Sequence, residues 1–74
     1  MNNLPYDVKR MIEGIHENTL NSKRSVSVAL SFCNIISSED NGPDASLLAT
    51  VQAEINKTDR NLSNILDLVK RLLG

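Results

Sequence analysis

A run of thirty residues, 44–73, contains neither proline nor glycine and constrains the fold more than any other part of the chain. Mostly apolar side chains recur along it at alternating steps of three and four, namely Leu48, Val51, Ile55, Thr58, Leu62, Ile65, Val69 and Leu72. This is the heptad spacing of a helix that packs against another helix. A helix of about 45 Å, at 1.5 Å per residue, cannot bury such a stripe alone. The rest of the chain, or a partner, must therefore supply a second helix.

The first half of the chain follows the same alternation without a slip, at Val8, Ile12, Ile15, Thr19, Ser22, Val26, Ala29, Cys33 and Ile36. This continuity predicts a single helix over 5–37, with Pro5 at its first position, where a missing N–H is tolerated. Poor helix formers between Asn18 and Ser22 leave open a break there, which would give a three-helix arrangement. Polar and apolar residues alternate over 25–32, as in a strand, but the chain offers no second strand, so a helix is favoured.

The segment 38–43 reads as a turn, since an Asn-Gly pair permits a left-handed backbone and Pro43 with Asp44 suits the start of a helix over 44–73. The sequence thus predicts an all-α fold, an antiparallel helical hairpin that occupies 1–74 as one domain.

Folding the chain about this turn makes neighbours of positions whose numbers sum to 80 or 81, such as Val26 and Ile55. Ser22 and Thr58 then share a layer, which predicts a small hydrogen-bonded contact between the helices.

Composition excludes several classes of protein. One cysteine and one histidine allow no intramolecular disulfide and no zinc site, so we expect a reducing, cytoplasmic location. No secretory signal and no membrane-spanning segment is apparent. A net charge of −1 and only two aromatic residues argue against nucleic-acid binding. We therefore expect no cofactor, metal or nucleic acid among its ligands, and no membrane span.

Catalytic arrangements are also missing. His16 and Cys33 are 17 residues apart, which is about 25 Å along one helix, so they cannot form a thiol–imidazole pair. Glu13 and His16 have the spacing of di-iron helical bundles. Because Ile12 and Ile15 are expected to occupy the helix–helix seam, Glu13 and His16 should point into solvent. The chain is therefore predicted not to be an enzyme, with Cys33 as a small core residue.

Two helices cannot cover all the apolar residues that remain. We expect a partner-binding surface to be drawn from eight of them: Val28, Leu30, Phe32, Ile35, Leu47, Leu66, Leu68 and Leu73. They would be covered either by a homodimer or third helix, as ordinary core, or by another helical protein, with Phe32 as the anchor. The sequence leaves both open.

Charge is uneven along the predicted hairpin. The open end gathers four basic residues, Lys9, Arg10, Lys70 and Arg71, whereas the turn gathers three acidic ones, Glu39, Asp40 and Asp44. Such charges suit the dipoles of the second helix at Asp44 and at Lys70 and Arg71. They would also orient a charged partner.

A resemblance to a known group is carried by the start of the second helix, in the pattern Leu47-Leu48-Ala49-x-x-Gln52-x-x-Ile55-Asn56-Lys57. It resembles the segment after the turn in the small helical-hairpin proteins of bacterial type III secretion systems, both needle subunits and their co-chaperones. Further positions similar to the C-terminal part of needle subunits are Ser63, Ile65, Lys70 and Leu72.

The resemblance implies an all-helical hairpin that binds another helical protein. Needle subunits carry a longer second helix and a tail, whereas this chain has nearly equal predicted helices, which is more similar to the co-chaperones. The function expected from it is that of a non-enzymatic interaction module, a co-chaperone of a needle subunit. The alternatives are a self-assembling needle-like subunit and an RNA-binding hairpin dimer of the Rop type.

Overall fold

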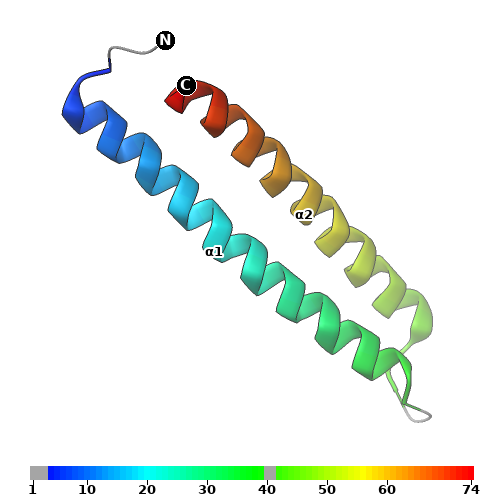
Figure 1. Ribbon diagram of the computed structural model, residues 1–74. Helices are drawn as coiled ribbons and strands as arrows, with labels where there is room; N and C mark the ends of the chain where they lie inside the picture. The colour runs from blue at the N-terminus through cyan, green and yellow to red at the C-terminus, as the bar shows by residue number, and fades with distance from the viewer. Residues whose placement is uncertain (1–3, 40–41) are drawn as a thin grey trace.

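Two long antiparallel helices form the molecule, as a computed structural model of residues 4–39 and 42–74 shows (Figure 1). Helix α1 runs over Tyr6–Ser37 and helix α2 over Ala45–Leu73, and together they contain 88% of the described residues. The Cα atoms extend over 57 × 14 × 12 Å, so the molecule is a rod, with Leu4 and Gly74 at the same end. The predicted all-α hairpin is confirmed.

Helix α1 continues without interruption through the segment where a break was considered, and 25–32 is helical rather than a strand. The poor helix formers there are accommodated because their side chains bond to carbonyls one turn back. Asn18 Nδ2 donates to the Gly14 carbonyl at 2.8 Å, and Ser22 Oγ to the Asn18 carbonyl at 3.0 Å. Packing against α2 along the whole rod then favours one continuous helix.

Each helix begins one residue later than predicted. The Pro5 carbonyl accepts from Lys9 N at 2.9 Å, but no side chain caps α1. Asp44 caps α2, since its carboxylate accepts from the backbone N–H groups of Ser46 at 2.8 Å and Leu47 at 3.2 Å. Helix α2 therefore carries the stronger start signal.

The predicted turn over 38–43 joins the two helices, with Asp40 and Asn41 lying outside the described residues. The left-handed backbone that the Asn-Gly pair permits is not adopted at Gly42. A Cβ at Gly42 would instead lie 3.2 Å from the Ile36 carbonyl oxygen and 3.4 Å from that of Glu39. Glycine is favoured here because the backbone approaches the end of α1 closely.

The helices meet along a seam that differs from the predicted one by a rotation of each helix. We define the seam as the buried and half-buried residues that follow steps of four and three: Ile12, His16, Thr19, Lys23, Val26, Leu30 and Cys33 on α1, and Leu48, Gln52, Ile55, Asp59, Leu62, Leu66, Val69 and Leu73 on α2. Every second residue agrees with the prediction, Ile12 and Val69 among them. The residues between them do not agree. Four positions after Ile12, His16 lies in the seam, whereas the prediction placed Ile15, three positions after Ile12, there.

Six of the seven apolar residues left out of the seam are exposed, which corrects the prediction that they form the core: Val8, Ile15, Ile36, Val51, Ile65 and Leu72. The seventh, Ala29, is half-buried. The relative displacement of the helices is as expected where the structure tests it. Val26 and Ile55 line one hollow, and Thr19 and Leu62 line another.

The prediction of a hydrogen bond between Ser22 and Thr58 is wrong. Each hydroxyl donates within its own helix, Ser22 to the Asn18 carbonyl and Thr58 to the Glu54 carbonyl, both at 3.0 Å. Polar contact between the helices is made by other residues, described below.

Candidate interaction surface

Groups that could support catalysis lie apart in the structure. Cys33 is buried, and among the described residues no three of the His, Cys, Asp and Glu side chains are placed to hold a metal ion. His16 lies half-buried in the seam, contrary to the prediction that it points into solvent, because Ile15 does not occupy the seam. Glu13 is exposed as expected. Neither α1 nor α2, within the described ranges, has a stretch apolar enough to cross a lipid bilayer.

One side of the seam is held by polar contacts. Lys23 Nζ lies 3.0 Å from Asp59 Oδ1 and donates to Ser63 Oγ at 2.7 Å, so the ammonium joins α1 to two residues of α2. The ion pair is partly open to water, with side-chain exposures of 30% and 39%. Beside this ion pair lies a row of mostly polar residues, which we call the polar flank. It consists of the residues one position on from the seam residues that agree with the prediction: Glu13, Leu20, Ser27, Asn34, Ala49, Asn56, Ser63 and Lys70.

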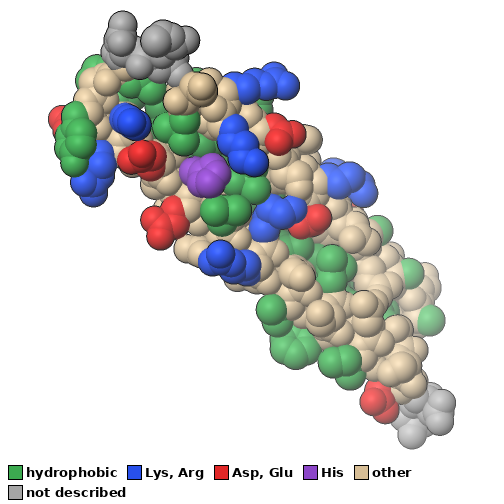
Figure 2. All heavy atoms as spheres, in the orientation of Figure 1, with side chains coloured by type: hydrophobic (Ala, Val, Ile, Leu, Met, Phe, Trp, Pro, Cys, Tyr) green, Lys and Arg blue, Asp and Glu red, His purple; other side chains and the backbone are tan. Residues whose placement is uncertain are grey.

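The face shown in Figure 2 carries the histidine amid basic and acidic side chains. The Lys and Arg side chains visible on this face lie between the terminal end and the middle of the rod, and none is visible beside the turn. The charged side chains are solvated, and hydrophobic side chains are visible beside them and towards the turn (Figure 2).

The other side of the seam is apolar although it is exposed. We call it the groove face. It consists of the residues three positions on from the seam residues that agree with the prediction: Ile15, Ser22, Ala29, Ile36, Val51, Thr58, Ile65 and Leu72. Six of these eight are hydrophobic, against two of the eight on the polar flank. The hairpin therefore exposes its more apolar side to solvent.

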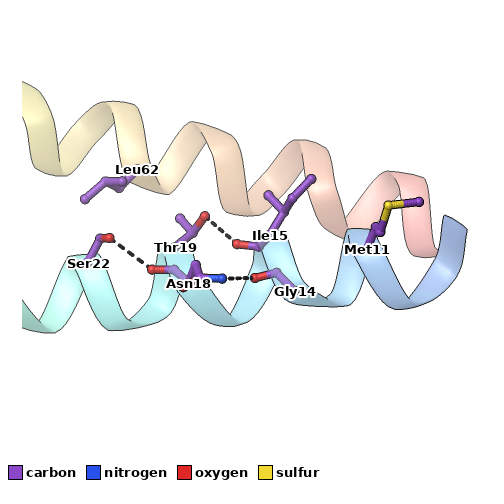
Figure 3. Close-up of a pocket in the computed structure, with 7 residues that line it drawn as sticks. All are labelled: Met11, Gly14, Ile15, Asn18, Thr19, Ser22 and Leu62. Atoms are coloured by element: carbon purple, nitrogen blue, oxygen red, sulfur yellow. Dashed lines mark hydrogen bonds between the residues drawn. The ribbon is translucent and has the colours of Figure 1, made fainter. Parts of the chain in front are cut away.

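Two hollows follow the groove face. The first has a volume of about 440 Å³ and runs along α1, with Met11 at one end and Ser22 at the other, where Leu62 of α2 lies across from it (Figure 3). Gly14, with no atom within 4 Å of the position a Cβ would take, leaves part of it open. Its polar side chains, Asn18 among them, are bonded to carbonyls of α1 (Figure 3).

The second hollow, of about 280 Å³, has Val26 and Ile55 among its lining residues, with Ala29 from one helix and Thr58 from the other. Residues of the groove face from both helices thus line one depression. Such an apolar channel between two helices accepts the ridge of side chains on another helix.

The eight residues predicted to bind a partner fall into two groups. Five are more than half exposed: Val28, Phe32, Ile35, Leu47 and Leu68. Leu30, Leu66 and Leu73 are half-buried and belong to the seam. Sequence reasoning missed Ile15 and Ile65 as surface residues because their spacing assigned them to the core.

No protein-family model matches this chain, and no curated protein and no solved structure matches it either.

Proposed function

We propose that this chain is a non-enzymatic module that binds helices through apolar surface which its own hairpin leaves uncovered. The observation that carries the proposal is the contrast between the two sides of the seam. The apolar groove face is open, while the polar flank is bonded across the helices by Lys23. Exposed apolar surface of this extent on a small protein is typical of an interaction site.

A second exposed stripe supports the same function. Val28, Phe32 and Ile35 lie on the turn-proximal half of α1, and Phe32 is 60% exposed. An aromatic ring on a rigid helix is a frequent centre of binding energy. This stripe is the surface that we propose for a different helical protein.

The form of this function that we propose is a co-chaperone of a type III secretion needle subunit. The similarity of the segment starting at Leu47 supports it. A self-assembling needle-like subunit is the alternative, and it would form filaments where a co-chaperone forms a complex of fixed size.

The test is affinity purification from the native host with wild-type protein and with Phe32→Asp, followed by mass spectrometry and reconstitution of the complex from purified components. We expect a defined complex with a helical protein, lost in Phe32→Asp because a charge in a dry interface costs several kcal/mol. Circular dichroism should show unchanged helix content in Phe32→Asp.

The matched control is Ser31→Asp, which adds the same charge at the neighbouring exposed position and should leave the complex intact. A wild-type protein that neither self-associates nor forms a complex with a helical protein would contradict the proposed function.

A further inference from the structure

The groove face has an internal symmetry along the rod. Residues of α1 and α2 whose numbers sum to 80 lie in common layers when the chain folds about its turn, and Ser22 with Thr58 forms the middle layer. The layer on the terminal side contains two large side chains, Ile15 and Ile65. The layer on the turn side contains smaller ones, Ala29 and Val51.

Suppose that two copies meet groove face to groove face and are related by a two-fold axis that passes through the middle layer, perpendicular to the rod. The layers on either side of the middle then face each other. The axis places Ile15 of one copy against Ala29 of a second copy, and Ile65 against Val51. Large side chains then meet small ones, as close packing requires. The middle layer meets itself, Ser22 on Ser22 and Thr58 on Thr58. A copy with its turn at the same end would place large on large and small on small.

Charge selects the same orientation. Residues 25–56 contain no Lys or Arg and four Asp or Glu, a net charge of −4. The remainder of the chain, towards the termini, has eight basic and five acidic side chains, a net charge of +3. Two copies with their turns at opposite ends bring these unlike halves together, whereas turns at the same end bring like halves together.

The size of the face suits a stable dimer. A face of 57 by 14 Å has a projected area of about 800 Å², which is the area that each partner buries in a standard interface. Covering its polar residues costs little, since the Ser22 and Thr58 hydroxyls already donate to carbonyls of their own helices.

We infer that the groove face binds a second copy of this chain, with the two turns at opposite ends, to give a four-helix bundle. This rests on the proposed function and specifies one partner of the module. In the bundle every helix contributes three positions in seven to a common core, which is typical of a four-helix bundle. The outer residues Val28 and Ile35 stay exposed, so the dimer retains a surface for a different protein.

The first test measures orientation without altering the groove face. A Cys33→Ser, Ser37→Cys protein carries one spin label at the end of α1, and pulsed electron paramagnetic resonance gives the distance between labels. Ser37 is 15 residues from Ser22, about 22 Å at 1.5 Å per residue, so the labels should lie on the order of 45 Å apart. Labels within about 20 Å, the span of a bundle cross-section, would overturn the orientation.

The second test measures which side associates, by analytical ultracentrifugation of the whole protein. The wild type should have twice the monomer mass of 8.2 kDa. Ile15→Asp should weaken dimerisation at least about 100-fold, because it buries an unpaired charge twice per dimer. Leu20→Asp, the matched control on the polar flank, should change it less than threefold.

An unchanged dimer in Ile15→Asp would overturn the inference, as would a wild type that stays monomeric. Failure of the dimer alone does not contradict the proposed function. That function is contradicted only if, in addition, no complex with a different helical protein is recovered. A monomeric wild type that still binds such a protein through Phe32 would be consistent with the proposed function and would contradict the inferred dimer.

Discussion

The two sides of the helix pair are built from residues of opposite character. On the polar flank, Lys23 contacts Asp59 and Ser63, so the helices are joined by a half-exposed ion pair and a hydrogen bond. On the groove face, the side chains of Ile15 and Ile65 remain 48% and 38% exposed. A hairpin that were complete alone would bury its apolar side. This difference is the observation on which we base the proposal that the hairpin binds further helices.

The ion pair contributes orientation more than stability. Its partial exposure limits its worth to about 1 kcal/mol at most. Rotating both helices to bury Ile15 and Ile65 within one hairpin would pull Lys23 and Asp59 apart on the opposite side. The polar contacts thus fix which apolar residues remain available to a partner.

The largest effect is expected from a cross-link that fixes the register on which both sides depend. Val26→Cys with Ile55→Cys, in a Cys33→Ser background, should form an intramolecular disulfide and stabilise the hairpin by about 3 kcal/mol, because it closes a loop of roughly 30 residues. Thermal unfolding with and without reductant measures this. Disulfides found between chains alone would show that these positions pair across an intermolecular seam.

A pair of alanine substitutions compares the seam with the groove face. Ile12→Ala should lower the free energy of unfolding by about 2 to 4 kcal/mol, since Ile12 is only 9% exposed. Ile15→Ala should lower it by less than about 1 kcal/mol in the monomer, where half of that side chain is already in water.

Urea unfolding at protein concentrations low enough to dissociate any dimer gives both values. Equal losses would mean that Ile15 is packed within the hairpin, and the contrast between the two sides would disappear. At high protein concentration, where the groove face is covered, the loss for Ile15→Ala should increase.

The smallest change in stability is expected where the ion pair beside the polar flank is made apolar. Lys23→Met with Asp59→Leu removes both charges and should alter the free energy of unfolding by no more than about 1 kcal/mol. It should, however, add apolar surface beside the polar flank, so sedimentation should show species larger than a dimer. A double variant with the wild-type mass would show that the ion pair has no part in selecting the face.

The sequence predicts the helices well because their signals are local. Steps of three and four, Pro5, Asp44 and the glycine-containing turn define two helices to within one residue. The choice of seam depends on how many helices share one apolar face, which spacing does not state. Heptad positions at Ile15 and Ile65 read as core, and they are exposed in the hairpin. They would be core in the four-helix bundle that we propose.

Other details depend on contacts that only the folded chain makes. Lys23 and Asp59 are 36 residues apart in the sequence, and nothing in their local spacing distinguishes them from solvated charges. Ser22 and Thr58 were expected to bond to each other, yet each reaches a carbonyl of its own helix more directly. Gly42 looked like a left-handed turn residue and is instead required by the nearness of the Ile36 carbonyl.

The register of the seam also determines how the chain folds in time. Seam residues next to the turn, such as Cys33 and Leu48, are separated by 15 residues, whereas Ile12 and Val69 near the termini are separated by 57. Closing a short loop costs less entropy than closing a long one, so contacts beside the turn form first and the helices zip towards the termini. Substitutions near Cys33 should then slow folding, while those near Ile12 should mainly speed unfolding.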